Sequence, residues 1–361
     1  MTLLITGGAG FIGTNFVRYW QKHYPQERII ILDALTYAGN YQNIADLVCD
    51  NLLFIKGCIT DSDLVLNVLN QYQVSKVIHF AAESHVDRSI LEPDIFIKTN
   101  ILGTHTLLKA VLSVMAAKNN KIHFHHISTD EVYGSLNESD PEFTELSRFE
   151  PNSPYSASKA ASDHFVRAYN VTYGLPITIS HCSNNYGPFQ NQEKMIPLII
   201  NNILEGLPLP IYGNGQNIRD WLYVEDHCVA IDKILSKGKI GETYNIGGGT
   251  EINNLDLVHN ICTLIEQIFI ENSDFKKIFP KAPCSTSKKN KNLITFVTDR
   301  KGHDFRYAIN GSKIKNKLGF FATYSLEDGL KNTIQWFIEQ KIKEKVSKDA
   351  IEMTNATMEK I

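Results

Sequence analysis

Two adjacent carboxylic acids, Asp130 and Glu131, stand in the segment STDEVYG (128–134), directly after an apolar run that predicts a strand. If both carboxyl groups are buried together, like-charge repulsion raises the pKa of one of them, which gives one acid and one base. Such a pair can remove a carbon-bound proton and protonate a departing hydroxyl, which is the chemistry of an elimination. Without other signals, a solvated loop in which Asp130 caps a helix explains the same residues.

Tyr155 and Lys159 are four residues apart in the segment YSASK, within a pattern that predicts a helix. That spacing places both side chains on one face of the helix. A free tyrosine has a pKa of about 10, which is too high for a base at neutral pH, but a nearby ammonium lowers it. The phenolate could then take the proton from a sugar hydroxyl while a hydride leaves the same carbon. Taken alone, this spacing is more often a surface pair on an ordinary helix.

Gly7, Gly10 and Gly13 form a GxxGxxG pattern between a predicted strand and a predicted helix. Glycine lets the backbone approach a pyrophosphate closely, and the helix N-terminus offers free N–H donors and the positive end of the helix dipole. Asp33 ends the next predicted strand, where an acid accepts hydrogen bonds from ribose hydroxyls and repels a 2′-phosphate. The arrangement predicts a dinucleotide site that prefers NAD to NADP. The alternative is a glycine-rich turn that binds nothing.

Cations and amides in the second half of the chain could bind an anionic ligand. Lys194, Arg219 and Arg300 are the candidates, because an arginine fork matches a diphosphate bidentately. Each of the three alone is more typical of a surface charge. Asn184 and Asn185 follow the sixth predicted strand, where side-chain amides could orient a sugar or a nicotinamide.

Three histidines, His123, His125 and His126, raise the question of a metal site. In a strand His123 and His125 share one face and His126 points away. No carboxylate or cysteine in the pattern completes a ligand set, so we expect no metal site. We expect Trp221 in the core rather than stacked on a base.

The elements that must position these residues alternate between strands and helices. Nearly continuous apolar strands in such an alternation predict an α/β fold with a parallel sheet that helices cover on both faces. Ligands then bind beyond the carboxyl ends of the strands. The predicted strands are 3–6, 29–33, 52–56, 76–82, 122–129 and 176–182, and the predicted helices are 13–23, 61–71, 94–118 and 156–173.

The sequence pattern changes after residue 185, where prolines and glycines interrupt the alternation of predicted strands and helices. We therefore expect residues 1–185 to form a dinucleotide-binding domain, and residues 186–361 to form a smaller substrate-binding lobe. Segments around 226–250 are expected to return to the first domain. The run 285–292 is predicted to be a solvated loop.

Composition excludes several classes of protein. The chain has 361 residues and is 43% hydrophobic, which excludes a disordered protein. The 36 Lys and Arg against 39 Asp and Glu give a net charge of −3, which provides no general attraction to nucleic acid or to anionic membranes. The six cysteines form no CxxC pair, which is typical of a reduced, cytoplasmic protein. We expect neither a signal peptide nor a transmembrane span.

A resemblance to a known family rests on motifs that occur in a fixed order over residues 1 to about 335. The chain resembles the extended short-chain dehydrogenases/reductases, and within them the nucleotide-sugar 4,6-dehydratases, which implies a Rossmann-type doubly wound sheet with a smaller C-terminal substrate-binding lobe. The Thr-Asp-Glu triplet is the most specific element, because related 4-epimerases keep the glycines and YxxxK without the acidic pair. The motifs are GGAGFIG, AAESHVDRS (81–89), STDEVYG, YSASK, SNNYGP (183–188), RDWLYVEDH (219–227) and DRKGHD (299–304).

The resemblance implies a reaction on dTDP-glucose that gives dTDP-4-dehydro-6-deoxyglucose and water. Tyr155, helped by Lys159, would remove the 4-hydroxyl proton while the C4 hydride passes to NAD. Glu131 would take the C5 proton and Asp130 would protonate the C6 hydroxyl, after which the hydride returns to C6 from bound NAD. Thr129 would bind the 4-hydroxyl group of the sugar.

The resemblance also implies binding residues and a partner. The implied NAD contacts, besides the three glycines, are Phe11, Ile12, Asp33, Thr36, Cys58, Ile59, Ala81, Ala82, Thr99, Tyr155, Lys159 and Asn185. The implied substrate contacts are Ser84, Thr129, Asn184, Lys194, Arg219, Asn254, Arg300 and His303. A homodimer is implied, with residues 94–118 and 156–173 as the candidate interface helices.

The sequence departs from the family pattern at a few positions, and other functions stay open. Cys58 replaces the usual acid that meets the adenine, Ala34 replaces a lysine after Asp33, and Lys301 replaces a proline. The alternatives are a dehydratase or 4-epimerase that acts on another nucleotide sugar, such as UDP-glucose. A dinucleotide-sensing module without catalysis is a third hypothesis, against which the intact catalytic residues argue.

Overall fold

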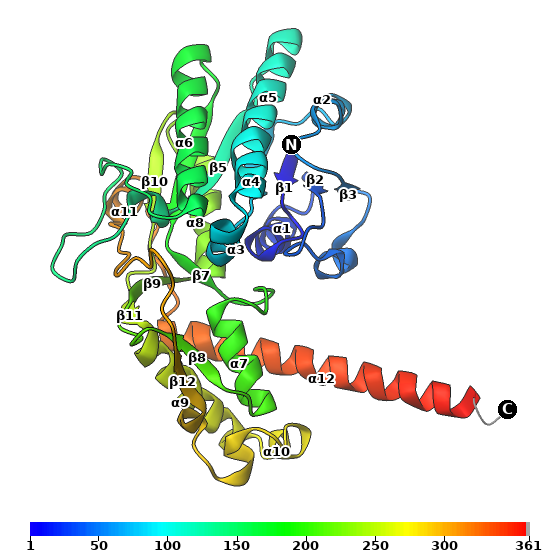
Figure 1. Cartoon of the computed structure of the whole chain (residues 1–361). Helices are drawn as coiled ribbons and strands as arrows, with labels where there is room; N and C mark the ends of the chain where they lie inside the picture. Colours follow the sequence, from blue (N-terminus) through cyan, green and yellow to red (C-terminus); the bar gives the residue numbers. More distant parts are fainter. Residues whose placement is uncertain (359–361) are drawn as a thin grey trace. The chain divides into compact units, whose positions relative to one another are not determined.

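The computed structural model describes residues 1–358, and side chains up to residue 347. The chain divides into two compact units (Figure 1). Unit 1 comprises Met1–Asn185, Asn217–Ile252 and Arg300–Tyr324, and unit 2 comprises Tyr186–Gln216, Asn253–Asp299 and the chain from Ser325 onward. The sequence analysis assigned residues 300–324 to the second lobe. The structure places them in unit 1, because α11 (Ser312–Leu318) packs against α8 (Val224–Lys237) and the neighbouring strand β10 (Thr243–Ile246).

Seven parallel strands form the sheet of unit 1, which confirms the predicted α/β doubly wound architecture. Their order across the sheet is β10-β6-β5-β4-β1-β2-β3, so that the direction of winding reverses between β1 and β4. Ligands bind at such a reversal because the connections leave the two neighbouring strands on opposite faces. The strands are β1 (Thr2–Thr6), β2 (Arg28–Asp33), β3 (Leu52–Lys56), β4 (Lys76–His79), β5 (His123–Thr129), β6 (Ile177–Cys182) and β10.

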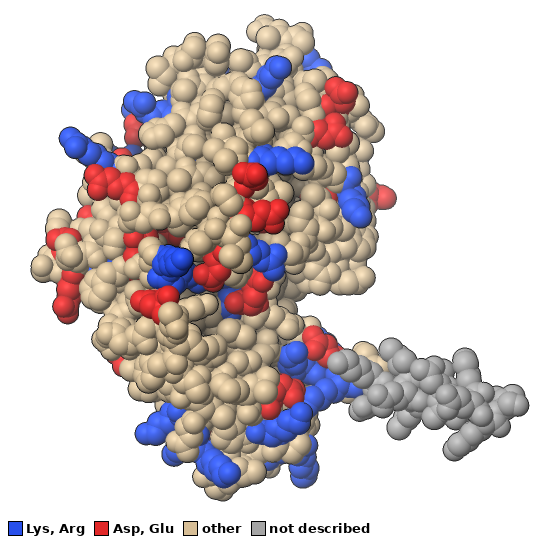
Figure 2. All heavy atoms as spheres, in the orientation of Figure 1, with Lys and Arg blue, Asp and Glu red and all other residues tan. Residues whose placement is uncertain are grey.

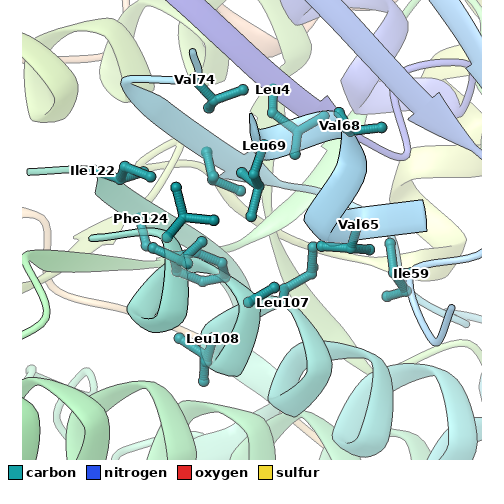
Figure 3. Close-up of a cluster of buried hydrophobic side chains, with 14 of the residues drawn as sticks. Leu4, Ile59, Val65, Val68, Leu69, Val74, Leu107, Leu108, Ile122 and Phe124 are labelled. Atoms are coloured by element: carbon teal, nitrogen blue, oxygen red, sulfur yellow. The ribbon is translucent and has the colours of Figure 1, made fainter. Parts of the chain in front are cut away.

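Helices cover both faces of this sheet, which explains why most residues of its strands are buried, including the polar residues of β5 and β6. One core cluster joins the sheet to α2 (Ser62–Gln71), α5 (Thr104–Lys118) and α6 (Pro154–Tyr173). A second joins it to α1 (Phe11–His23) and α8. Figure 3 shows the first cluster, in which Leu4 of β1 and Phe124 of β5 gather with Leu107 and Leu108 of α5.

The predicted helix 94–118 is present in the structure, but its geometry changes along its length. A short helix, α4 (Pro93–Phe96), continues into a π-helical segment, η3 (Ile97–Gly103), and then into α5. By length and composition alone, Pro93–Lys118 is apolar enough to cross a membrane. Its residues Leu107 and Val111 are nevertheless fully buried in the core of unit 1, so we interpret it as a core helix.

The remaining elements of unit 1 are short. They are η1 (Tyr41–Asn43), η2 (Ala45–Leu47), α3 (Val86–Leu91), η4 (Asp130–Tyr133), β9 (Ile218–Tyr223) and α11. β9 lies at the centre of a three-stranded sheet between β7 (Asn184–Tyr186) and β11 (Glu251–Asn253). Trp221 on β9 is buried, as predicted.

Unit 2 is mainly helical. Its strands β8 (Leu209–Tyr212) and β12 (Ile294–Val297) pair in parallel, and its helices are α7 (Met195–Glu205), α9 (Asn254–Glu271), α10 (Phe275–Ile278) and α12 (Leu326–Met358). The run 285–292 is not a wholly solvated loop, since it passes through η5 (Pro283–Thr286) and η6 (Asn290–Leu293) and buries Asn290 against Cys262 O. On the face drawn in Figure 2, basic side chains outnumber acidic ones toward the lower edge of the view.

We predict that Leu107→Ala destabilises the protein, because the side chain is fully buried between α5 and the sheet. Loss of a buried leucine costs about 2–5 kcal/mol of unfolding free energy, measurable by denaturant unfolding followed by circular dichroism. The control is Leu146→Ala, at a side chain that is 95% exposed, which should change the free energy by less than about 0.5 kcal/mol. Equal effects of the two substitutions would contradict the core that we describe.

Candidate active site

The glycine loop lies between β1 and α1, at the reversal of the sheet. Gly7 has a positive φ of +72°, and a Cβ atom there would lie 2.6 Å from the Ala81 backbone N that follows β4. A Cβ atom at Gly13 would lie 2.2 Å from Gly7 O. Gly10 caps α1 without a side-chain hydrogen bond, so no side chain competes there for the N–H groups of the first turn. Because Gly7 and Gly13 carry no side chains, a pyrophosphate could approach the backbone of this loop closely.

Asp33 ties this loop to the end of β2. Its Oδ2 accepts a hydrogen bond from Ala9 N at 2.9 Å, and its Oδ1 accepts one from Leu35 N at 2.8 Å. Burial raises the pKa of Asp33, and the two backbone hydrogen bonds oppose that rise. Each carboxylate oxygen keeps a second lone pair, so the group can still accept hydrogen bonds from ribose hydroxyls.

The other residues predicted to contact NAD also lie in unit 1. They follow the carboxyl ends of the central strands or belong to the helices beside them: Phe11 and Ile12 in α1, Thr36 after β2, Cys58 and Ile59 after β3, Ala81 and Ala82 after β4, and Thr99 in η3. Cys58 is exposed, and its Sγ lies 3.0 Å from Thr60 Oγ1. The arrangement fits a dinucleotide that lies along the carboxyl edge of the sheet.

Asn185, predicted near the nicotinamide, is held by a residue that the sequence analysis missed. His227 Nδ1 of α8 donates a hydrogen bond to Asn185 Oδ1 at 2.8 Å, and Asn185 Nδ2 donates to Ser183 O at 2.9 Å. Burial lowers the pKa of His227 to about 3, so the ring is neutral at physiological pH. Nothing in the local sequence around His227 indicates this contact.

Tyr155 lies in the first turn of α6, which begins at a capping box formed by Ser153 and Ser156. Tyr155 and Lys159 are 9% and 5% exposed, and Lys159 Nζ donates to Ile127 O at 2.7 Å. The sequence analysis predicted a lowered pKa for Tyr155, but burial and the charge of Glu131 raise it in this structure. Burial also lowers the pKa of Lys159. A phenolate here therefore depends on nearby positive charge and on the positive end of the α6 dipole.

The three residues Thr129, Asp130 and Glu131 lie where β5 ends and η4 begins. Thr129 Oγ1 accepts a hydrogen bond from Glu131 N at 3.3 Å, and the Thr129 hydroxyl also hydrogen-bonds the Tyr155 phenol. Asp130 is 2% exposed, and burial, Glu131 and Asp220 raise its pKa well above the usual value. Among the described residues, Asp130 Oδ2 has no hydrogen-bond partner. The structure thus brings the acidic pair beside the Tyr155 phenol, and the raised pKa of Asp130 favours its protonated form.

Arg219, predicted to bind the diphosphate, is largely engaged by backbone carbonyls. Its Nη1 donates to Ile218 O at 2.7 Å and its Nη2 donates to Asp304 O at 2.9 Å. The guanidinium also lies 4.2 Å from the centre of the Tyr307 ring. Its charge lowers the pKa of Asp130, so Arg219 is part of the electrostatic surroundings of the acidic pair.

The remaining predicted substrate residues are divided between the units. In unit 1, Arg300 Nη2 donates to Asp87 Oδ2 at 2.9 Å, and Ser84, Asn184 and His303 belong to the same unit. Lys194, which precedes α7, and Asn254, which begins α9, belong to unit 2. Six of the eight predicted substrate contacts thus belong to unit 1 and two belong to unit 2. Among the described residues, no group of three or more His, Cys, Asp and Glu side chains is placed to hold a metal ion.

Asn100 is a second polar residue that the sequence analysis missed. Within η3 its side chain accepts a hydrogen bond from Glu83 N at 2.8 Å and donates to Glu83 O at 3.0 Å and Ser158 Oγ at 2.8 Å. It thereby ties the loop after β4 to the helix that carries Tyr155. The π-helical geometry that places Asn100 there has no recognisable sequence signal.

The parallel sheet, the glycine loop and Asp33 define a dinucleotide-binding protein of the Rossmann class, and the Tyr155–Lys159 pair is that of a short-chain dehydrogenase/reductase. A family model described as GDP-mannose 4,6 dehydratase matches residues 4–333. The chain belongs to this family of nucleotide-sugar dehydratases.

Individual relatives agree with this assignment. The dTDP-glucose 4,6-dehydratase of Xanthomonas campestris pv. campestris (strain B100) is 48% identical over 342 residues, which cover 93% of each chain. That of Salmonella typhimurium is 48% identical over 351 residues, which cover 94% of this chain and 93% of the relative. The solved dTDP-glucose 4,6-dehydratase of Streptomyces venezuelae, which has NAD bound, is 43% identical with a TM-score of 0.81, covering 94% of this chain and 97% of that one.

We predict that Gly13→Ala weakens NAD binding at least tenfold, or about 1.4 kcal/mol, because the new Cβ collides with Gly7 O. The measurement is calorimetric titration of the NAD-depleted protein. The matched control is Gly311→Ala, where a Cβ meets nothing within 4 Å, and its affinity should be unchanged. Normal NAD affinity in Gly13→Ala would remove the loop from the binding site.

Proposed function

We propose that this chain is a dTDP-glucose 4,6-dehydratase, an NAD-dependent hydro-lyase that converts dTDP-glucose to dTDP-4-dehydro-6-deoxyglucose and water. The observation that carries the proposal is the acidic pair beside the Tyr155 phenol, in which Asp130 is buried and Glu131 is partly buried. The relatives at 48% identity bear this name, and they align over nearly the whole chain.

NAD, when bound, accepts the hydride from C4 and returns it to C6 within one turnover. Tyr155 takes the proton from the 4-hydroxyl group, and Lys159 supplies positive charge that favours the phenolate. The carbonyl formed at C4 acidifies the C5 proton, which Glu131 removes. Asp130 gives its proton to the C6 hydroxyl, so that the C6–O bond breaks and water leaves. Thr129 hydrogen-bonds the 4-hydroxyl group of the sugar.

The division of roles between the two carboxyl groups follows from their surroundings. Asp130 is the more deeply buried, and its raised pKa keeps the proton on this group at neutral pH. As the pH rises through this raised pKa, Asp130 loses its proton and the elimination slows. Thr129 and Asn184, with Arg219, Arg300, Ser84, His303, Lys194 and Asn254, remain our proposed substrate contacts.

A 4-epimerase is the less favoured candidate. The solved UDP-glucose 4-epimerase of Thermotoga maritima is 27% identical to this chain, with a TM-score of 0.79 over 94% of this chain and 99% of that one. Epimerisation needs no acid to expel a hydroxyl, so it gives no reason for a buried, protonated Asp130. Comparing turnover of dTDP-glucose and UDP-glucose tests the choice of nucleotide.

We also propose a cytoplasmic homodimer. The helices that flank the site leave large apolar side chains in water: Leu91 of α3 is 85% exposed, Leu102 of η3 is 52% exposed, and Phe165 and Val171 of α6 are 40% and 70% exposed. Apolar side chains that gather on neighbouring helices favour an interface with a second copy.

We predict that Glu131→Gln blocks the elimination while leaving substrate binding nearly intact. Turnover of dTDP-glucose in deuterated water should place one deuterium at C5 of the product of the native protein, because solvent replaces the proton that Glu131 removes. Mass spectrometry of the product measures this, and the C5 exchange rate should fall at least a hundredfold in the variant. Tyr155→Phe is the companion variant, in which the oxidation step itself should stop. Unchanged exchange in Glu131→Gln would exclude this residue as the base.

We predict that Leu102→Glu together with Phe165→Glu converts a dimer into a monomer, because two charges on the apolar helix faces cannot be desolvated on association. Light scattering coupled to gel filtration gives the mass. The control is Leu146→Glu, which changes a 95% exposed loop side chain of the same unit and should leave the dimer intact. A native protein that is monomeric at micromolar concentration would refute the proposed interface.

A further inference from the structure

A third ionisable residue lies on the stripe of α6 that carries Tyr155 and Lys159. Asp163 follows Lys159 by four residues, so the three side chains recur once per turn along one face. Asp163 is 2% exposed, and none of the steps described above uses it. A carboxylate so deeply buried must be stabilised by specific partners, and those partners indicate its role.

Three side chains from the sheet hold the Asp163 carboxylate. Ser128 Oγ donates to its Oδ2 at 2.8 Å, and His181 Nε2 lies 2.9 Å from the same oxygen. His126 Nε2 lies 3.2 Å from Oδ1. Burial raises the pKa of Asp163, but its interactions with His126 and His181 outweigh burial and bring the pKa well below the usual value. The lowered pKa favours the ionised form of Asp163 at neutral pH.

His126 lies in contact with both Asp163 and Lys159. Its Nε2 is 3.5 Å from Lys159 Nζ, and burial lowers the pKa of the ring to about 4, so that it is neutral. Burial also lowers the pKa of Lys159, and the charge of Asp163 opposes that change. The negative charge thus acts on the ammonium across a neutral ring rather than through an exposed ion pair.

Other ionisable groups also face this cluster from the elements packed against α6. Burial lowers the pKa of His79 on β4 and raises that of Cys182 on β6 to about 12, so neither is charged at neutral pH. The charges that bear on the phenol itself come from η4. The ionisable groups around the cluster include His79, His126, Asp130, Glu131, Tyr133, His181 and Cys182.

We propose that Asp163 is a positioning residue, whose carboxylate, acting across His126, holds the Lys159 ammonium charged and directed toward the Tyr155 phenol. Asp163 acts through Lys159, not on the sugar. The inference rests on the proposed function only in taking Tyr155 as the base. The stripe Tyr155, Lys159 and Asp163 then works as a unit in which the last residue sets the charge of the middle one.

The sign of one measurable change distinguishes this role from simple electrostatics. If the Asp163 charge acts directly on Tyr155, its removal would stabilise the phenolate and lower the pKa of Tyr155. If the Asp163 charge acts by keeping Lys159 protonated, its removal would cost Lys159 its proton, destabilise the phenolate and raise the pKa of Tyr155. The proposal requires the second result.

The experiment is a pH titration of the NAD-bound protein, without substrate, followed by tyrosinate ultraviolet absorbance. Subtraction of the matching Tyr155→Phe variants isolates the Tyr155 signal. We expect Asp163→Asn to raise the Tyr155 midpoint by about one pH unit. Asp163→Glu, which keeps the charge, should restore most of the native midpoint. A midpoint that falls or does not move in Asp163→Asn would overturn the proposal.

Ser128→Ala is the matched control, because it removes a hydrogen bond to the same carboxylate without changing its charge. Its Tyr155 midpoint should equal that of the native protein, and a shift as large as that of Asp163→Asn would show a merely structural role. In a Lys159→Met background, Asp163→Asn should cause no further loss of turnover, because no ammonium is left to hold. An additional loss there would also overturn the proposal.

Folding of Asp163→Asn is checked by circular dichroism with NAD present. If it does not fold, Asp163→Asn with His181→Gln replaces it, since changing both members of a buried pair is milder than removing one. The same rise in the Tyr155 midpoint is expected, and its absence counts against the proposal. Because the titration contains no sugar nucleotide, a wrong assignment of dTDP-glucose would leave this result unaffected.

Discussion

The desolvation of charge at the carboxyl edge of the sheet is the constraint on which the candidate site depends. Burial pushes three ionisable groups there toward their neutral forms: it raises the pKa of Asp130 and Tyr155 and lowers that of Lys159. The same burial makes each remaining charge act strongly on its neighbours, because little water screens it. Burial thus explains both why Asp130 keeps its proton and why the Tyr155 phenolate needs a nearby cation.

The parallel sheet explains why so many of these groups meet in one place. The reversal of winding between β1 and β4 brings the Gly7 loop against the backbone at Ala81, with no space for a side chain between them. β5 is the neighbour of β4, so Thr129 and Asp130 end at the same edge. Helix α6 then crosses the face of β5 and β6 and brings Tyr155 and Lys159 to that edge.

Partners on the sheet determine what the helix side chains do. His126 and Ser128 lie two residues apart on β5, and His181 lies opposite Ser128 on β6, so all three face α6. Of the three histidines that raised the question of a metal site, His126 lies against the Asp163 carboxylate, whereas His123 and His125 hydrogen-bond Thr178 on β6. In a similar way, a hydrogen bond from His227 fixes Asn185, and a hydrogen bond to Asn100 fixes the loop after β4.

Local sequence determined the alternation of strands and helices, the glycine loop, Asp33 and the order of the catalytic motifs, because these depend on periodicity and on spacing within one turn or one strand. Only the tertiary structure decided the rest. It raised the Tyr155 pKa, which was expected to fall, and engaged Arg219 with backbone carbonyls. It also gave the helix at 94–118 a π-helical middle and placed residues 300–324 in the first unit. Each of these outcomes depends on burial or on contacts between distant segments, which no local pattern encodes.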